Sequence, residues 1–266
     1  MSEFFDPTRI AQKAKRWVIK VGTSVLTDER ERKVGRHCVQ SVASEIVSLW
    51  KNKKEAILVT SGAIGIGMGV LDLKTRPQEL AQLQAAAATG QGKLMQWYAG
   101  RMEEEGFHAA QVLLTRGDLE DRQRRMNVKA TLETLLKAGI VPIINENDTV
   151  STEEIRYGDN DLLSAHVAAL VDADLLLILT DVDRLIGPDE EPLHRVKEIT
   201  PELERAGRGT DKESSTGGGQ SKFEAAKIVL AHGIPMAVMN GRGCANLADL
   251  LKGAEGRGTW FVHERA

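Results

Sequence analysis

Short apolar runs recur along the chain and alternate with longer segments in which apolar positions repeat with a helical period. Continuous apolar runs are typical of parallel strands that are buried on both faces, and their alternation with helices is typical of βαβ units. The pattern therefore predicts an α/β fold around a mainly parallel sheet. The expected strands are Trp17–Val21, Ala56–Thr60, Ala110–Leu114, Ile140–Ile144, Leu175–Leu179 and Pro235–Met239.

The longer segments often begin beside Asn, Asp, Gly or Pro and end near a glycine, as helices do. Between them, Thr152–Tyr157 is expected to form a hairpin arm and Gly187–Lys197 a mobile connection. The chain shows no internal repeat and no clear linker, so residues 1–266 are expected to form a single domain. The expected helices are Arg36–Lys51, Pro77–Glu105, Asn127–Ala138, Asp161–Leu170, Gly219–His232 and Cys244–Leu251.

Composition excludes several classes of partner. The 266 residues can bury a substantial core, while a net charge of -3 and a pI near 6.1 give no basic footprint for nucleic acid or an anionic membrane. The most apolar long stretch, Leu162–Leu179, is interrupted by His166, Asp172 and Asp174, which argues against a membrane span. A small-molecule partner is therefore expected.

The compartment is expected to be the cytoplasm. The N-terminal residues contain no apolar stretch of signal-peptide length. Cys38 and Cys244 lack metal-ligand spacing and are too few for a disulfide framework, which favours a reducing environment.

Polar residues follow several of the expected strands, where ligands bind in open α/β sheets. Lys20 lies within an apolar strand, and a buried ammonium group requires an anionic partner, for which a phosphate would serve. A lysine that reaches solvent from a strand end is the alternative. The turn Gly22-Thr-Ser24 favours phosphate, because it offers backbone and hydroxyl donors.

Two glycine-rich turns are weaker signals when each is taken alone. The segment Ser61–Gly67 offers backbone N–H groups to a ligand carboxylate, although such turns are often only packing devices. The segment Thr216–Lys222 precedes a helix and could cradle polyphosphate, or it could be a flexible loop. Neither matches a dinucleotide fingerprint or a Walker sequence. Paired with Lys20, however, Lys222 fits phosphoryl transfer, which needs distributed positive charge.

The segments Asn145-Glu-Asn-Asp148 and Gly158-Asp-Asn-Asp161 are the most informative clusters. Asn and Asp are common in turns and helix caps, so a structural role is a serious alternative. An amino-acid substrate nevertheless explains the set, since its ammonium group needs Asp148 and an amide oxygen. Its carboxylate would then meet the donors of Ser61 and Gly62.

Together these motifs resemble the amino acid kinase family, and within it the glutamate 5-kinases, over nearly the whole chain. The resemblance implies a three-layer αβα sandwich, with residues 1–172 binding glutamate and residues 173–266 binding ATP. It implies that Lys20 and Lys222 flank the transferred phosphoryl group and that Asp161 holds both lysines. It also implies glutamate contacts at Ser61, Gly62, Asn145, Asp148 and Asn160, and ATP contacts at Lys20, Gly22, Thr180, Asp181, Thr216, Gly217, Gly218, Gly219, Gln220, Ser221 and Lys222.

The implied reaction is the ATP-dependent phosphorylation of L-glutamate to L-glutamyl 5-phosphate, the entry to proline synthesis. Mg²⁺ would bridge ATP phosphates, and no protein residue is assigned as a metal ligand. Feedback inhibition by proline, a homo-oligomer (dimer or tetramer) and coupling to glutamyl phosphate reductase are further expectations from the resemblance. So is a short form that lacks the PUA domain. Val182–Gly187 departs from the family pattern, which leaves the nucleobase contacts open.

Two alternatives remain open from the sequence. One is another member of the same family that acts on acetylglutamate, aspartate, carbamate or a nucleotide. The other is a catalytically silent amino-acid sensor on the same scaffold.

Overall fold

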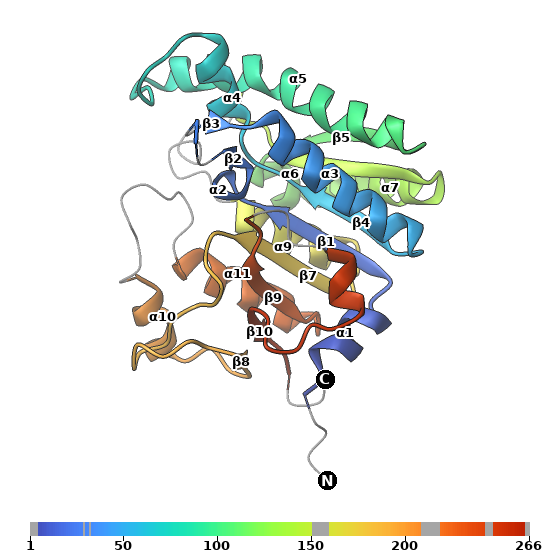
Figure 1. The fold of residues 1–266 in the computed structure, drawn as a ribbon, viewed down its shortest axis with the longest axis vertical. Helices are drawn as coiled ribbons and strands as arrows, with labels where there is room; N and C mark the ends of the chain where they lie inside the picture. The colour runs from blue at the N-terminus through green and yellow to red at the C-terminus, as the bar shows by residue number, and fades with distance from the viewer. Residues whose placement is uncertain are drawn as a thin grey trace.

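The computed structural model describes residues 5–28, 30–31, 33–150, 160–208, 219–242 and 247–263. Its strands are β1 Arg16–Val21, β2 Thr27–Asp28, β3 Lys33–Val34, β4 Glu55–Val59, β5 His108–Leu114, β6 Ile140–Glu146, β7 Leu175–Thr180, β8 Arg195–Val196, β9 Met236–Asn240 and β10 Thr259–Phe261. Eight of these form one sheet in the order β5-β6-β4-β1-β7-β9-β10-β8, which runs from top to bottom of Figure 1. Its neighbours pair in parallel except β9 and β10. Strands β2 and β3 form a separate antiparallel pair.

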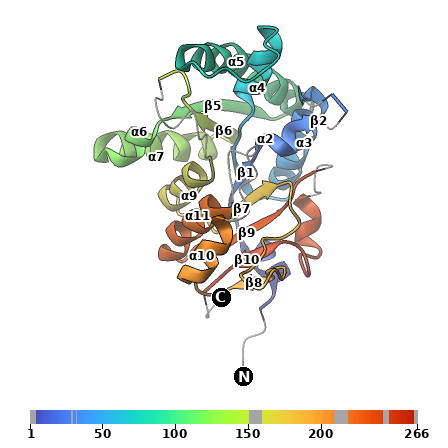
Figure 2. The same cartoon turned by 90° about the vertical axis from the view of Figure 1, so that its left-hand side faces the viewer.

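Helices cover both faces of the sheet. They are α1 Pro7–Lys13, α2 Thr23–Leu26, α3 Arg36–Lys51, α4 Ala63–Val70, α5 Leu80–Glu104, α6 Arg116–Glu120, α7 Arg122–Lys137, α9 Asn160–Leu170, α10 Pro201–Arg208, α11 Gly219–Ala231 and the 3₁₀ helix η1 Leu247–Leu251. Buried side chains of α1, α3, α4, α5 and η1 pack on one face, and those of α6, α7, α9 and α11 pack on the other. Figure 2 shows α7, α9 and α11 along one side of the sheet and α3 along the opposite side. The αβα sandwich is thereby confirmed.

The central strand β1 shows how the apolar pattern produces two cores. Trp17 and Ile19 point into the core on the α3 side, and Val18 points into the core on the α9 side. Side chains alternate along a strand, so Lys20 lies on the same face as Val18, which is the face covered by α9. All four side chains are buried.

The expected strands and long helices are present, with boundary shifts of a few residues. Helix α5 begins at Leu80, because the segment before it, which contains Pro77, is irregular. The helix expected over Cys244–Leu251 is a 3₁₀ helix from Leu247 in the part described. The segment Gly187–Lys197, expected to be a mobile connection, contains regular structure. Its end forms β8, and an antiparallel bridge pairs Ile186 with Pro192 near its start. The expected hairpin arm, residues 152–157, lies outside the described residues.

Helices α4 and α5 touch backbone to backbone. A side chain on Gly67 would place its Cβ 1.7 Å from the Ala86 carbonyl oxygen, and one on Gly90 would place it 1.9 Å from the Ala63 carbonyl oxygen. Glycine at both positions is what permits this approach. Because α4 follows the Ser61-Gly62 turn directly, α5 lies firmly against the element that carries this turn.

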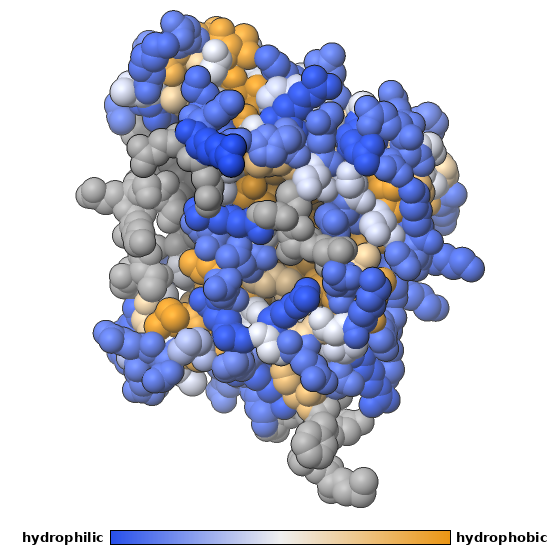
Figure 3. All heavy atoms as spheres, viewed as in Figure 1, coloured by the Kyte–Doolittle hydropathy of each residue, from blue (hydrophilic) through white to orange (hydrophobic). Residues whose placement is uncertain are grey.

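The surface seen in Figure 3 is hydrophilic over most of its described area, with apolar side chains gathered where α4 and α5 lie. Val70 and Leu71, at the end of α4, are 49% and 44% exposed. Within the described residues, no helix combines the length and apolar character needed to cross a membrane.

Candidate active site

The polar clusters singled out in the sequence meet at the carboxyl edge of the sheet. Lys20 in β1 pairs in register with Val59 of β4 and with Ile178 of β7. The residues at the carboxyl ends of these strands, including Ser61 after β4 and Thr180 at the end of β7, therefore lie near the end of β1. This is the edge at which open α/β folds bind ligands.

Three charged side chains form the centre of this edge. Asp161, in the first turn of α9, is fully buried, and its two oxygens lie 2.5 Å from Lys20 Nζ and 3.1 Å from Lys222 Nζ. The Ser221 hydroxyl donates to the same carboxylate at 2.9 Å. Ser164 Oγ donates to the Asp161 carbonyl at 2.6 Å, which holds the start of α9 in place. Elements far apart in the sequence are thus joined through one carboxylate.

The electrostatics of this cluster favour an ionised Asp161. Burial alone would raise the pKa of the Asp161 carboxyl, but the ammonium groups of Lys20 and Lys222 hold that pKa well below its usual range. Two ammonium groups against one carboxylate leave a net charge of about +1 in a buried place. Such a site is suited to an additional anion, because the anion completes the charge balance.

A network of side-chain amides lies beside the charged cluster. Asn160 Nδ2 donates to the Thr60 carbonyl at 2.6 Å, to Ser61 Oγ at 3.0 Å and to Asn145 Oδ1 at 3.0 Å. Asn145 Nδ2 in turn donates to Gln91 Oε1 at 2.9 Å. Asn145 and Asn160, on β6 and α9, are therefore brought together with the turn after β4, as the sequence suggested.

Backbone groups fix which way these amides point. The Glu146 N–H can only donate, and it donates to Asn145 Oδ1 at 2.9 Å, so Asn145 Nδ2 must face the other way. The Thr60 carbonyl can only accept, so Asn160 must turn its Nδ2 toward that carbonyl. The Asn160 carbonyl oxygen is consequently the end of this amide that can accept a bond from a ligand.

Asp148 lies in the turn that follows β6, at the same carboxyl edge of the sheet. Burial raises the pKa of the Asp148 carboxyl to about 6, and the Arg76 guanidinium opposes part of this rise. A carboxylate that loses this much hydration gains from a cationic ligand group. A carboxylate and an amide carbonyl, as Asp148 and Asn160 offer at this edge, are the kinds of acceptor that the ammonium group of an amino acid needs.

The Ser61-Gly62 turn supplies donors next to these acceptors. Gly62 has a φ of 98°, a left-handed conformation that favours glycine, and it caps the N-terminus of α4. The first N–H groups of a helix have no partner within the helix, so they are free to bind an anionic group. The turn thus matches the carboxylate end of an amino acid.

The structure describes some of the residues that are expected to contact the nucleotide. A Cβ on Gly22 would lie 3.6 Å from Lys20 Nζ, which puts this turn beside the charged cluster. Gln220 donates to Glu224 on the next turn of α11 at 3.0 Å, so its amide is engaged within the helix. Ser221 is engaged with Asp161, while Gly219 is buried at the start of α11. Thr216, Gly217 and Gly218 lie outside the described residues.

Residues at the ends of β7 and β9 form a further polar group, of which the sequence singled out Thr180 and Asp181. Arg242 Nη2 lies 3.4 Å from Asp181 Oδ2, and Thr180 Oγ1 donates to Asp181 Oδ1 at 3.2 Å. Asn240 Nδ2 donates to Asp183 Oδ1 at 2.9 Å. Asn240 and Arg242 were not singled out from the sequence, although Gly241 between them is the kind of residue that follows the other strands.

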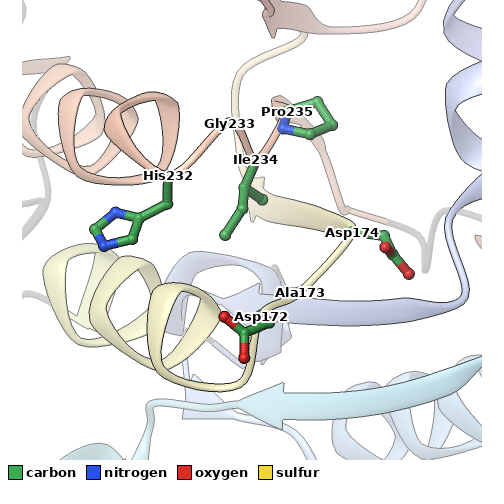
Figure 4. A pocket seen from close by; sticks show the side chains of 7 residues that line it. All are labelled: Asp172, Ala173, Asp174, His232, Gly233, Ile234 and Pro235. Atoms are coloured by element: carbon green, nitrogen blue, oxygen red, sulfur yellow. The ribbon is translucent and has the colours of Figure 1, made fainter.

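A cavity of about 290 Å³ lies at the opposite, amino-terminal edge of the sheet (Figure 4). Its carboxylates already have protein partners, since Asp174 accepts from the N–H groups of Lys15 and Arg16 and Asp172 from the Lys129 ammonium group. The cavity therefore does not compete with the carboxyl edge as a functional site. It is lined by Asp172, Ala173, Asp174, His232, Gly233, Ile234 and Pro235.

Comparison with known proteins identifies the family. The sequence profile of the Amino acid kinase family matches residues 15–240. The chain belongs to the amino acid kinase family. Its site thus combines a family scaffold with the charged cluster and the amide network described above.

Two similar proteins of known sequence are glutamate 5-kinases. The chain is 47% identical to a glutamate 5-kinase of Moorella thermoacetica, over 94% of this chain and 67% of the relative. It is also 47% identical to a glutamate 5-kinase of Symbiobacterium thermophilum, over 94% of this chain and 97% of the relative. A solved amino acid kinase fold, the carbamate kinase from Giardia lamblia bound to AMP-PNP, superposes with a TM-score of 0.63 at 18% identity and covers 95% of this chain and 99% of that one.

Proposed function

We propose that the chain transfers the terminal phosphoryl group of ATP to the side-chain carboxylate of L-glutamate, giving ADP and L-glutamyl 5-phosphate. The observation that carries this proposal is the Lys20-Asp161-Lys222 cluster beside a site with acceptors for an ammonium group. The likeness to glutamate 5-kinases over most of the chain supports the same acceptor. The product is an acyl phosphate, so the reaction that consumes it would be a reduction or a condensation of an acyl phosphate.

The reaction requires no covalent bond between the protein and the substrates. The side-chain carboxylate of glutamate has a pKa of about 4.3, so it is already ionised near neutral pH and needs no general base. One carboxylate oxygen forms the new P–O bond while the bond from the phosphorus to the ADP oxygen breaks. Lys20 and Lys222 stabilise the charge on the moving group, and Asp161 keeps them apart from each other and in place.

ATP enters with Mg²⁺, which neutralises phosphate charge as part of the substrate. Among the described residues, no three His, Cys, Asp or Glu side chains gather in an arrangement that holds a metal. Lys20, Gly22, Thr180, Asp181 and the segment 216–222 would contact the nucleotide.

The proposal is tested by ADP release from MgATP with the purified protein. L-glutamate is compared with aspartate, N-acetylglutamate, bicarbonate plus ammonia, and UMP, with hydroxylamine present to trap an acyl phosphate. Glutamate-dependent ADP release with trapped glutamyl hydroxamate is expected. Activity with another acceptor alone would overturn the substrate assignment, and folded protein without ADP release would favour an amino-acid sensor.

Replacing Asp148 with asparagine is expected to raise the KM for glutamate by about tenfold to a hundredfold, since a charge-assisted hydrogen bond contributes about 1.5–3 kcal/mol. In the parent protein, kcat/KM for glutamate should fall as the pH drops through about 6, because the Asp148 carboxyl with its raised pKa becomes protonated there. The asparagine variant should lose this part of the pH dependence. Steady-state kinetics across pH 5 to 8 measure both effects.

Asp172→Asn, at the other end of the sheet, is the matched control for this substitution. It should leave the glutamate KM and its pH dependence unchanged. An Asp148→Asn variant whose ATP KM rises while its glutamate KM stays constant would contradict the assignment.

Inhibition by proline is a further part of the proposal. Proline carries an ammonium and a carboxylate group on one carbon, as glutamate does, so the acceptors at Asp148 and Asn160 and the donors at Ser61 suit both. We expect proline to raise the apparent glutamate requirement, as measured by initial rates at several proline concentrations. Unchanged glutamate kinetics with proline present would remove this expectation. Self-association and coupling to a reductase stay predictions.

A further inference from the structure

Gln91 is a buried polar side chain to which the mechanism gives no role. It lies on α5, two turns before Tyr98, and is 9% exposed. Its Oε1 accepts from Asn145 at 2.9 Å, while its Nε2 is buried and has no hydrogen-bond partner among the described residues. An unpaired buried donor is destabilising, so its presence beside a binding site calls for an explanation.

A rotated amide would not remove the unpaired donor without creating a worse contact. Turning Gln91 over would place its Nε2 against the Nδ2 of Asn145, so that two donors would face each other. Asn145 cannot turn in response, because its Oδ1 is held by the Glu146 N–H and by Asn160 Nδ2. The orientation of Gln91 is therefore dictated by a backbone group, and its carbonyl must face Asn145.

The carbonyl of Gln91 is the first link of a chain that orients Asn160. Gln91 Oε1 accepts from Asn145 Nδ2, and Asn145 Oδ1 accepts from Asn160 Nδ2, which leaves the Asn160 carbonyl oxygen as the end that can accept from a ligand. Without the Gln91 acceptor, Asn145 would carry an unpaired buried donor and would hold Asn160 less firmly, so the oxygen offered to the ligand ammonium would be less well positioned.

We propose that Gln91 is a positioning residue that makes the site selective for acceptors with an ammonium group. It acts through Asn145 and does not touch the substrate. The inference rests on the proposed function in that it takes an amino acid as the acceptor. It assigns α5 a part in specificity in addition to its packing against α4.

The test compares L-glutamate with glutarate, which has both carboxylates and lacks the amino group. Binding of each to the whole protein is measured by calorimetry, together with kcat and KM for glutamate. Gln91→Met keeps the length of the side chain and removes the acceptor, whereas Gln91→Glu keeps an acceptor oxygen. Gln96→Met, on the exposed side of the same helix, is the matched control.

Gln91→Met is expected to lower the ratio of glutamate to glutarate affinity by about threefold to tenfold, the size of one neutral hydrogen bond, with kcat for glutamate changed by less than about threefold. Gln91→Glu and Gln96→Met should keep the ratio within about twofold of the parent protein. Thermal unfolding of each variant checks that it is folded.

Equal losses of glutamate and glutarate binding in Gln91→Met, or a lower Tm with an unchanged ratio, would overturn the proposal and leave Gln91 a packing residue. If Gln91→Met does not fold, the ratio of glutamate to glutarate affinity is measured in Gln91→Leu instead, and the same outcomes apply. A parent protein that phosphorylates only acceptors without an ammonium group would overturn the proposed function as well. If the parent protein phosphorylates glutamate but Gln91→Met keeps the parent ratio of glutamate to glutarate affinity, only the Gln91 inference is overturned.

Discussion

Replacing Asp161 with asparagine is expected to lower turnover by about a thousandfold and to reduce the free energy of unfolding by about 3–5 kcal/mol. The substitution keeps the shape of the side chain but removes the only carboxylate that the structure places within 3.1 Å of both Lys20 and Lys222 in the described residues. Two buried ammonium groups would then repel each other without a counter-charge. Initial rates at saturating substrates and denaturant unfolding without nucleotide measure the two effects.

Nucleotide should partly restore the stability of this variant. The phosphates of MgATP bring negative charge to the lysines, so added MgATP should raise the Tm of Asp161→Asn by more than it raises that of the parent protein. Asp172→Asn, on an exposed loop, should change neither turnover nor stability. A stable and active Asp161→Asn variant would contradict the view that Asp161 organises the cluster.

Replacing Lys20 or Lys222 with methionine is expected to lower kcat by about a hundredfold to a thousandfold, the usual loss when one group that stabilises a transition state is removed. The expected effect on stability is much smaller than that of Asp161→Asn. One carboxylate and one ammonium group remain paired in either variant, whereas the asparagine variant leaves two ammonium groups. The methionine side chain also fills most of the space of the lysine stem.

Lys227→Met is the control for Lys222→Met, because Lys227 lies on the same helix and pairs with Glu204 at the surface. Its kcat should equal that of the parent protein. The assignment would fail if either buried-lysine variant kept its kcat and showed only a higher KM for glutamate, while Asp148→Asn lost turnover instead. The split between kcat and KM separates the catalytic from the binding end of the site.

Much of the fold was readable because buried parallel strands leave an unmistakable apolar run, as β1 and β7 do. The short strands β8 and β10, with two and three residues, were not predicted, because runs of that length carry no periodicity. The helix α10 was also missed. Its exposed, charged sequence resembles that of a loop, and its position depends on packing against α11.

The charged centre of the site was predictable for a physical reason. Lys20 stands in an apolar strand, and the cost of burying its charge implied an anionic partner, for which a phosphate was suggested. The structure places the Asp161 carboxylate against Lys20, a pairing that the family resemblance had implied. Gln91 could not be recognised in the same way, since a glutamine in a long helix usually faces solvent. Its burial arises from tertiary packing of α5, which no local pattern records. The roles assigned to the site residues stay predictions until they are measured.

The close contact of α4 with α5 limits how this enzyme can be redesigned. With Gly67 and Gly90 backed by carbonyl oxygens, neither position can accept even a methyl group without separating the two helices. A library that seeks new acceptor molecules should therefore keep both glycines and vary the side chains around them. Such a library cannot rely on a hinge motion between α4 and α5. Altered specificity therefore has to come from exchanging polar side chains while the two helices keep their positions.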